Sequence, residues 1–478
     1  MSNIIIGREK ELLILNEVLL SNRPELVSII GRRRVGKTFL IKNAFKNNII
    51  FELTGIQNSD KTEQLQNFVF SMKRYFKNYQ PVKPPESWIE AFDGLNNEIE
   101  KEKNGKKKVI FMDELPWLSS PRSGFLNGFS YFWNSCMADK NIVVVICGSA
   151  VSWMIKKVIN HKGGLHNRVT RLMMLKPFTL AETEKFCLSN KIRLNRFQLV
   201  QLYMTMGGIP MYLTQLRAGE SAVQNIQRIF FEPSGFLNQE FDRLFSSLFE
   251  NYQNHLEVIK TLATKWRGMT RQEIINTTKF TNGGGLTEIL EELEQSDFIT
   301  VYAAYDKKTK ESLYRLTDPY SLFYLTFMTK NMRKNAEFAK LSDLQQWKIW
   351  SGYAFENICL NHVSQIKGAL SIKGISTSTA TFLMRPNEDT SGTQIDLLID
   401  RSDNSINICE MKFSEQPFEI TKKVAENIEI KKQVFRQFGK TKKHLFTTLI
   451  SPFGVVDNRY KLNHIDHIIT MDDLFSNS

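Results

Sequence analysis

The feature that most constrains the fold is a loop near the start of the chain, Gly31-Arg-Arg-Arg-Val-Gly36-Lys37-Thr38. It fits the pattern G-x-x-x-x-G-K-[ST] and lies between an apolar run of strand type, Leu26 to Ile30, and a helical pattern, Phe39 to Phe45. Glycines in such a loop let backbone N–H groups point inward, and the N-terminus of the following helix adds a positive partial charge. The sequence therefore predicts a phosphate site at the edge of an open α/β domain.

The region around this loop alternates between short apolar runs and helical patterns. Runs without polar alternation are typical of strands buried on both faces of a parallel sheet. The expected strands cover residues 26–30, 49–53, 109–112, 142–147 and 169–175, and the expected helices cover 39–45, 60–75, 88–102 and 124–137. This order predicts β-helix-β units around a parallel sheet.

The residue types in and after the loop predict binding of ATP and Mg²⁺. Lys37 is expected to meet the β- and γ-phosphates, and Thr38 to ligate Mg²⁺. Asp113 and Glu114 follow the strand 109–112, where Asp113 would order the metal and Glu114 would polarise the attacking water. The predicted nucleotide-binding residues of the loop are Gly31, Arg32, Arg33, Arg34, Val35, Gly36, Lys37, Thr38 and Phe39.

A polar residue also ends the next buried run, because Ser149 follows Gly148. Its hydroxyl could sense the γ-phosphate of a bound nucleotide, or it could cap the N-terminus of a following helix. The sequence leaves both interpretations open.

Beyond the first sheet the pattern divides the chain into three further parts. Helical patterning runs from a capping box at Thr179 and Glu182 to about residue 250, with an interruption from Gly207 to Pro210. Three expected helices and the strand pair 298–305 and 312–316 then have the order of a winged helix. Helices at 320–328 and 344–363 lead into a second, smaller α/β domain, with strands at 395–399, 406–413 and 443–450 and a helix at 428–438.

This last domain holds acidic and basic residues in the PD-(D/E)xK nuclease pattern. Thirteen residues separate Asp396 from Glu410, and Glu410 and Lys412 stand two apart, so they face the same side of a strand. Asp396 and Glu410 would hold Mg²⁺, which lowers the pKa of a bound water, and Lys412 would stabilise the developing charge. Glu356 fits a further acidic residue from the preceding helix. The other interpretation is a solvated face that exposes Glu and Lys. The predicted catalytic residues of the chain are Glu114, Glu356, Asp396, Glu410 and Lys412.

Lysines near the expected helix 428–438 could line a groove for a nucleic-acid backbone, with Gln433 near the site, or they could form a solvated helix face. They are Lys422, Lys423, Lys431, Lys432, Lys440, Lys442 and Lys443. The formal net charge of +13 in 478 residues suits an anionic partner, and we expect DNA.

The cysteines and the N-terminus predict a soluble cytoplasmic protein without a membrane partner. Cys136, Cys147, Cys187, Cys359 and Cys409 lie far apart, without the spacing of a disulfide framework or a zinc site. The charged run from Gly7 to Glu11 interrupts any signal-peptide apolar region, and no stretch approaches 18 apolar residues.

These residues resemble a family, the AAA+ ATPases and particularly their STAND-like, archaeal-type branch, over about residues 4–330. The resemblance rests on the box Ile6 to Leu12, the loop, the strand 109–112 with its acidic pair, and the G-x-P motif that ends at Pro210. It implies that Pro210 lies beside the nucleotide, and that Arg168 or Arg171 resembles the arginine supplied to the γ-phosphate in cis or from a neighbouring subunit of a homo-oligomer. Arginines that flank a strand can also be solvated or structural. Many members have Asn at the position of Ser149, and in similar proteins a nuclease-like domain often follows the ATPase.

The predicted fold class is α/β with four domains. They are an AAA+ parallel-sheet ATPase core at residues 1–178, a helical lid at 179–250, a winged helix at 251–330, and a restriction-endonuclease-like α/β domain at 331–478.

Three functional hypotheses follow. The first is an ATPase whose nucleotide state controls a metal-dependent DNA nuclease domain, in defence against foreign DNA or in processing of mobile elements. The second is a nucleotide-dependent switch whose last domain binds nucleic acid or protein without cleavage. The third, a winged-helix transcription regulator, is weakened because the expected groove helix at 286–294 carries four carboxylates, which DNA phosphates would repel. Basic residues lie mainly in the wing, at Lys307, Lys308 and Lys310, so a packing or regulatory role is favoured over sequence-specific DNA binding.

Overall fold

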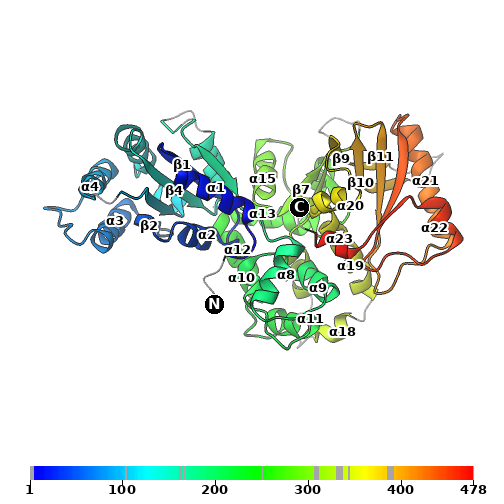
Figure 1. Ribbon diagram of the computed structural model, residues 1–478. Coiled ribbons are helices and arrows are strands. Elements are labelled where there is room, and N and C mark those ends of the chain that lie inside the picture. Colours follow the sequence, from blue (N-terminus) through cyan, green and yellow to red (C-terminus); the bar gives the residue numbers. More distant parts are fainter. Residues whose placement is uncertain are drawn as a thin grey trace. The chain divides into compact units, whose positions relative to one another are not determined.

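The computed structural model describes residues 5–102, 105–160, 164–165, 167–249, 251–305, 312–329, 337–342, 345–384 and 392–476. They belong to two compact units, residues 1–176 and residues 177–478 (Figure 1). The first unit ends two residues before the predicted boundary at 178. The three remaining predicted parts lie together in the second unit.

The first unit is built around a parallel five-stranded sheet. Its strands are β1 (Glu25–Ile30), β2 (Ile49–Thr54), β3 (Lys108–Asp113), β4 (Ile142–Gly148) and β5 (Arg171–Met174). Their order is β2-β3-β4-β1-β5, and all neighbours run parallel, which confirms the expected α/β class. Because β3, β4 and β1 are neighbours, residues that follow their carboxyl ends gather at one edge of the sheet.

Burial differs between the inner and outer strands of this sheet. Every residue of β1 and β4 is buried, as their unbroken apolar runs predict. The expectation that all five runs are buried on both faces is wrong for β2 and β5. These are the edge strands, and Leu172 and Met174 of β5 are exposed.

The described helices of this unit are α1 (Glu9–Leu20), α2 (Lys37–Ala44), α3 (Lys61–Tyr75), α4 (Trp88–Lys101), α5 (Leu115–Leu118), α6 (Phe125–Tyr131), η1 (Phe132–Met137), α7 (Val151–Met154) and η2 (Ile155–Ile159). The four helices that the sequence predicts for this unit are present, and α1 before β1, α5 after β3, and α7 and η2 after β4 are additions. Asp60 and Ser87 cap α3 and α4 by accepting backbone hydrogen bonds. Trp88, Phe92 and Phe125 form part of an aromatic core between these helices and the sheet.

The second unit begins with a helical segment. It comprises α8 (Leu180–Ser189), α9 (Arg196–Met206), α10 (Pro210–Leu213), α11 (Ala222–Ile226), η3 (Gln227–Phe231) and α12 (Glu240–Leu248). The capping box of Thr179 and Glu182 is present at the start of α8. Gly208 allows a close approach of two chain segments, because a Cβ there would lie 1.9 Å from the carbonyl oxygen of Phe178.

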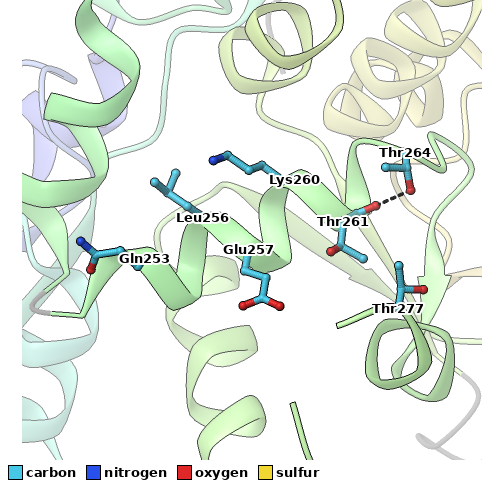
Figure 2. A pocket seen from close by; sticks show the side chains of 7 residues that line it. All are labelled: Gln253, Leu256, Glu257, Lys260, Thr261, Thr264 and Thr277. Atoms are coloured by element: carbon cyan, nitrogen blue, oxygen red, sulfur yellow. Dashed lines mark hydrogen bonds between the residues drawn. The ribbon is translucent and has the colours of Figure 1, made fainter. Parts of the chain in front are cut away.

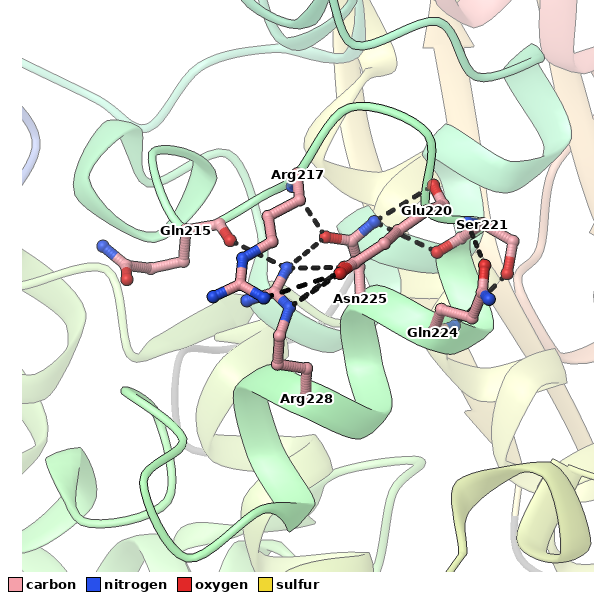
Figure 3. Close-up of polar contacts among 7 residues, drawn as sticks. All are labelled: Gln215, Arg217, Glu220, Ser221, Gln224, Asn225 and Arg228. Carbon is pink, nitrogen blue, oxygen red and sulfur yellow. Dashed lines mark hydrogen bonds and ion pairs between the residues drawn. The ribbon is translucent and has the colours of Figure 1, made fainter.

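Arg228 lies at the centre of a polar cluster in this segment (Figure 3). Its Nη2 donates to Glu220 Oε2 at 2.7 Å, to Asn225 Oδ1 at 2.7 Å and to Gln215 O at 3.1 Å. Because Arg228 belongs to η3 and its guanidinium contacts both the loop before α11 and Asn225 of α11, it fixes that loop on the helices.

A small antiparallel sheet follows, with order β6-β8-β7. Its elements are α13 (Tyr252–Leu262), β6 (Met269–Thr270), α14 (Arg271–Thr277), α15 (Gly284–Gln295), β7 (Ile299–Tyr302) and β8 (Leu313–Leu316). Strand β6 adds to the strand pair that the sequence suggests. The lysines at 307, 308 and 310 lie outside the described residues.

An open pocket of about 480 Å³ lies along α13 in this part of the chain. Its lining residues are Gln253, Leu256, Glu257, Lys260, Thr261, Thr264 and Thr277 (Figure 2). They include none of the residues that the sequence predicts for a nucleotide, metal or catalytic site.

The chain ends in a mixed five-stranded sheet. Before it lie α16 (Pro319–Phe323), η5 (Tyr324–Met328), α18 (Phe338–Ser342), α19 (Gln345–Asn361) and α20 (Val363–Ala369). The sheet and its helices are β9 (Thr377–Met384), β10 (Thr393–Arg401), β11 (Ser405–Met411), α21 (Lys422–Phe438), β12 (His444–Ile450), α22 (Arg459–His464), β13 (His467–Ile469) and α23 (Met471–Leu474). The order is β13-β12-β11-β10-β9, with β9, β10 and β11 antiparallel and β11, β12 and β13 parallel. Strands β9 and β13 were not expected from the sequence.

Several contacts join these parts of the second unit. The backbone N–H of Leu180, in α8, donates to His362 Nε2 at 3.1 Å, next to α20. Phe197 of α9 stacks on Phe413, which follows β11, with ring centroids 5.5 Å apart. Asn357 of α19 donates through Nδ2 to the carbonyl oxygen of Leu316, in β8, at 3.1 Å. In the described residues no helix is long and apolar enough to cross a membrane.

Candidate functional site

The loop between β1 and α2 has the backbone conformation that its glycines permit. Gly31, Arg34 and Gly36 have φ values of 154°, 72° and 94°. A Cβ at Gly31 would lie 2.4 Å from the carbonyl oxygen of Leu175, so the close approach of that backbone excludes any side chain. Gly36 precedes α2 without a side-chain cap, so it leaves the first-turn N–H groups of the helix to an outside acceptor such as phosphate.

Lys37 and Thr38 lie in the first turn of α2. The buried Lys37 donates through Nζ to Gly31 O at 2.7 Å and to Arg32 O at 3.1 Å. Thr38 Oγ1 donates to Asp113 Oδ2, at the end of β3, at 2.7 Å. The two residues predicted to hold Mg²⁺ beside the nucleotide are therefore in direct contact.

Glu114 and Ser149 form a second contact at the same edge of the sheet. Ser149 donates to Glu114 Oε2 through its hydroxyl at 2.8 Å and through its backbone N–H at 3.0 Å. Glu114 has a φ of 48°, a left-handed conformation that is uncommon outside glycine and concentrates at functional sites. The alternative of a helix cap at Ser149 is not observed, because Ala150 precedes α7 and no side chain caps that helix.

Cys147 contacts the other oxygen of Asp113. Its Sγ donates to Asp113 Oδ1 at 2.6 Å, and burial raises the pKa of the Cys147 thiol well above its usual value. The neutral thiol is thus the donor, and it orients the carboxylate. No role for Cys147 follows from the sequence, except that it lies two residues before Ser149.

The other predicted loop residues differ in burial. Arg32 and Val35 are buried, and the carbonyl oxygen of Val35 accepts a hydrogen bond from Arg8 Nη2 at 3.3 Å. Arg33 and Arg34 are half-buried, and Phe39 is exposed. Arg32 and Val35 contribute backbone carbonyl oxygens that accept hydrogen bonds from Lys37 and Arg8.

Arg168, Arg171 and Pro210, which the family resemblance implies as further site residues, are distant from the loop in sequence. Arg168 is exposed, and Arg171 is half-buried with Nη1 donating to Thr170 O at 3.0 Å. Residues 161–163 and 166 of the preceding loop lie outside the described residues. Pro210 is the first residue of α10 and belongs to the second unit.

The second unit brings the predicted carboxylates together from three elements. Glu356 comes from α19, Asp396 from β10 and Glu410 from β11, and Lys412 follows β11 directly. Strands β10 and β11 are paired, with Leu397 opposite Cys409. The pairing of β10 with β9 shifts between Ile395 and Leu398, so Asp396 lies in an irregular stretch that re-aims its side chain.

Three cationic side chains contact these carboxylates. Lys412 and Lys431 each place Nζ 2.7 Å from Glu410, at Oε1 and Oε2 respectively. Arg315 of β8 donates through Nη2 to Glu356 Oε2 at 2.9 Å, and its Nη1 lies 3.8 Å from Asp396 Oδ1. Asp396 also accepts a hydrogen bond from Gln394 Nε2 at 2.9 Å.

The contacts of two of these cations, Lys431 and Arg315, could not be predicted from the sequence pattern. Lys431 of α21, for which the sequence left a backbone groove and a solvated helix face open, pairs with Glu410, while Gln433 is exposed. Arg315 was not considered. An arginine between Leu313 and Leu316, in a strand with an apolar pattern, was the available signal, because a buried guanidinium requires a carboxylate partner.

Burial and charge set opposite pKa shifts in this cluster. Burial, together with the nearby charge of Asp396, raises the pKa of Glu356 to about 7 despite the ion pair with Arg315. Burial also favours the neutral form of Glu410, but the charges of Lys431 and Lys412 outweigh it and lower the pKa of that carboxyl. Glu410 therefore stays ionised, whereas Glu356 titrates near neutral pH.

The donor types suit a hard divalent cation, but their arrangement here does not present them to one. Carboxylate oxygens are the ligands that Mg²⁺ prefers. Among the described residues, however, no group of three or more His, Cys, Asp or Glu side chains is placed to hold a metal ion. Arg315, Lys412 and Lys431 neutralise the carboxylates instead.

Comparisons with known proteins identify the first part of the chain. Residues 5–216 match the model of an ATPase domain found predominantly in Archaea. The chain resembles in fold a Walker-type ATPase of Pyrococcus abyssi, with a TM-score of 0.51 and 20% identity over 68% of this chain and 96% of that one. This part of the chain is thus an archaeal-type ATPase domain.

Two uncharacterized proteins of Methanocaldococcus jannaschii are also similar. One is 26% identical over 365 residues, which cover 74% of this chain and 76% of the relative. The other is 30% identical over 100 residues, which cover 20% of this chain and 88% of the relative, and the chain belongs to one family with it.

Proposed function

We propose, from the premise that residues 5–216 belong to the archaeal-type ATPase family, that this chain binds and hydrolyses ATP with Mg²⁺ and that its nucleotide state controls a DNA-cleaving domain in the second unit. Cleavage would serve defence against foreign DNA or the processing of mobile elements. The observation that carries the proposal is the convergence of Glu356, Asp396, Glu410 and Lys412 from α19, β10 and β11, in a chain that also holds the phosphate loop.

The ATPase chemistry would use the edge of the parallel sheet. Backbone N–H groups of the loop and the ammonium of Lys37 would bind the phosphates, and Thr38 and Asp113 would hold Mg²⁺. Glu114 would act on the attacking water, and its contact with Ser149 would orient it. Arg168, exposed on the first unit, could reach a nucleotide of a neighbouring copy in a homo-oligomer.

The cleavage chemistry would use the carboxylates. Asp396 and Glu410 would hold a divalent metal, and such a metal lowers the pKa of bound water so that hydroxide forms near neutral pH. Lys412 would stabilise negative charge on the phosphate being attacked, because its ammonium already lies 2.7 Å from Glu410. In the sheet, β10 pairs antiparallel with β9 and β11, and β11 pairs parallel with β12. This mixed order supports a restriction-endonuclease-like domain.

We assign the three-stranded sheet a packing role as a winged helix. The carboxylates of α15 disfavour contact with DNA phosphates, and His255 Nε2 lies 2.8 Å from Glu292 Oε2, so α15 is engaged with α13. Arg315 of β8 contacts the carboxylate cluster directly. This module would support the cleavage site rather than read a DNA sequence.

A second candidate function is a nucleotide-dependent switch that binds nucleic acid or protein without cutting it. The observation that favours it is the pairing of every predicted carboxylate of the last domain with a cation of the chain. A site that is already neutralised needs no metal to be stable.

The experiment that separates the two candidates is a cleavage assay on the full chain. Linear, circular and single-stranded DNA are incubated with Mg²⁺ or Mn²⁺, with and without ATP, alongside Lys412→Ala and Asp396→Ala. The exposed residues Lys373 and Asp457 supply matched controls as Lys373→Ala and Asp457→Ala. Cleavage that is lost only in the two site variants establishes the nuclease. ATPase activity without cleavage of any substrate favours the switch.

A further inference from the structure

The carboxylate cluster contains two cations that the cleavage chemistry does not use, Lys431 and Arg315. Lys412 and Lys431 share Glu410, whereas Arg315 contacts Glu356 and lies near Asp396. Together, three carboxylates face three cations. Arg315 therefore neutralises negative charge that Glu356 and Asp396 would otherwise offer to a metal ion.

Arg315 forms its hydrogen bonds in the cluster through Nη2. Its side chain is 3% exposed, and Nη2 donates to Glu356 Oε2 at 2.9 Å and to Tyr353 O at 3.3 Å. Among the described residues its buried Nε has no hydrogen-bond partner, and the contact of Nη1 with Asp396 is an ion pair at 3.8 Å. A guanidinium that binds a carboxylate optimally forms two parallel hydrogen bonds. Here that geometry is missing, so the ion pair is weaker than it could be.

We propose that Arg315 is an internal counter-ion that competes with a divalent metal ion for Glu356 and Asp396, and that it keeps the carboxylate site in a metal-poor, inactive state. This inference rests on the proposed cleavage function of that site. Two cations within a few ångströms of the same buried carboxylates repel each other strongly, because the interior screens charge poorly. Binding of a metal and the Arg315–Glu356 contact therefore oppose each other.

The origin of Arg315 in β8 links this competition to the three-stranded sheet. Asn357 of α19, adjacent to Glu356, also contacts β8 through Leu316 O at 3.1 Å. Ala304, shortly after β7, forms a parallel bridge with Thr381 of β9. A displacement of this sheet would withdraw Arg315 and leave Glu356 and Asp396 to the metal.

The test is Mn²⁺ binding to the full chain without nucleotide, measured by titration calorimetry. Arg315→Gln removes the charge but keeps a donor for Glu356, and Arg315→Lys keeps the charge. Arg401, which pairs with Asp403 at the far end of β10, provides the matched control Arg401→Gln. We expect Arg315→Gln to bind Mn²⁺ at least about tenfold more tightly than the unmodified chain, and both Arg315→Lys and Arg401→Gln to stay within about threefold of it. Circular dichroism and thermal unfolding check the fold, and Arg315→Met replaces the Gln variant if that one does not fold.

Asp396→Ala in each background separates failure of the inference from failure of the proposed function. Suppose that Asp396→Ala removes the Mn²⁺ site, and that Arg315→Gln binds Mn²⁺ no more tightly than the unmodified chain. Arg315 then does not compete with the metal, although the metal site exists. An absence of any Asp396-dependent binding, in the unmodified chain and in Arg315→Gln alike, would overturn the inference and the metal-dependent cleavage together.

Discussion

Thr38 of α2 and Asp113 of β3 are joined by a hydrogen bond of 2.7 Å between Oγ1 and Oδ2. The residues are far apart in sequence, and the parallel order β3-β4-β1 brings them together. Asp113 is also fixed through Oδ1 by Cys147. The proposed Mg²⁺ position beside the nucleotide therefore has its two protein ligands already oriented.

This contact predicts the effect of changing Thr38. Thr38→Val removes the hydroxyl and keeps the shape, so we expect ATP hydrolysis to fall by about tenfold or more, because the metal loses a ligand and Asp113 loses an orienting donor. Thr38→Ser keeps the hydroxyl and should retain most of the activity. Phosphate release measured over a range of Mg²⁺ concentrations checks this. Equal activity of the Val and Ser variants would exclude a metal-ligand role.

Lys37 predicts a separation of the two proposed activities. Lys37→Ala should reduce ATP hydrolysis by about 100-fold, because a charged donor to the phosphates is lost. Lys42→Ala, on the same helix but half-exposed and paired with Glu52, should not. Lys412→Ala should abolish DNA cleavage and leave ATP hydrolysis intact, whereas Lys37→Ala should alter cleavage without removing it. If each variant is folded and both lose both activities, separate sites are ruled out.

Glu114 and Ser149 predict a graded effect on hydrolysis. Glu114→Gln should lower the rate by about 100-fold while ATP still binds, because the amide cannot take a proton from water. Ser149→Ala removes one of two hydrogen bonds to Glu114, so a loss of about tenfold is expected. Equilibrium binding of a fluorescent ATP analogue together with turnover rates distinguishes the two steps. Weakened binding with unchanged turnover would contradict the assignment.

Because His362 is buried, we expect the free energy of unfolding to fall in acid. Its Nδ1 donates to Ile358 O at 2.7 Å, its Nε2 accepts from Leu180 N–H, and burial lowers the pKa of His362 to about 4. As the pH falls, His362 is therefore protonated in the unfolded state at a higher pH than in the folded state. The contribution of His362 to the free energy of unfolding is complete above about pH 6.5 and is lost as the pH falls toward 4. The loss should amount to about 3.5 kcal/mol at most, at about 1.4 kcal/mol for each pKa unit.

Urea unfolding between pH 4 and pH 7 measures this effect. His362→Gln should flatten that part of the pH dependence, and His444→Gln, at an exposed position in β12, should leave it unchanged. The same slope in all three proteins would assign the acid sensitivity to other groups.

Local signals explain why the first unit could be predicted largely from the sequence. The loop 31–38, the strand that ends at Asp113 and the strand that ends before Ser149 each combine an apolar run with an adjacent polar residue. Parallel pairing then places these residues at one edge without further information. The contact of Ser149 with Glu114 needed the structure, because a serine after a strand is equally compatible with a helix cap.

The carboxylate cluster could be predicted only in part from short-range sequence patterns. Asp396, Glu410 and Lys412 could be selected by spacing, since strand periodicity is short-range. The partner of Glu356 could not, because Arg315 comes from a different sheet and meets Glu356 only through packing of β8 on α19. Strand β9 was missed for a related reason, because its burial follows no simple alternation along Thr377–Met384.

The stacking of Phe197 on Phe413 affects which fragments of the chain can be expected to fold on their own. A fragment that began after residue 330 would lose Phe197, Leu180 and Arg315 at once, and would leave an exposed aromatic face, an unsatisfied imidazole nitrogen and a buried carboxylate without its counter-charge. A fragment that began at Pro177 would keep all three contacts. The smallest portion of the C-terminal half that can be excised intact thus includes the helices α8 to α12, although the sequence pattern assigns them to the lid of the ATPase.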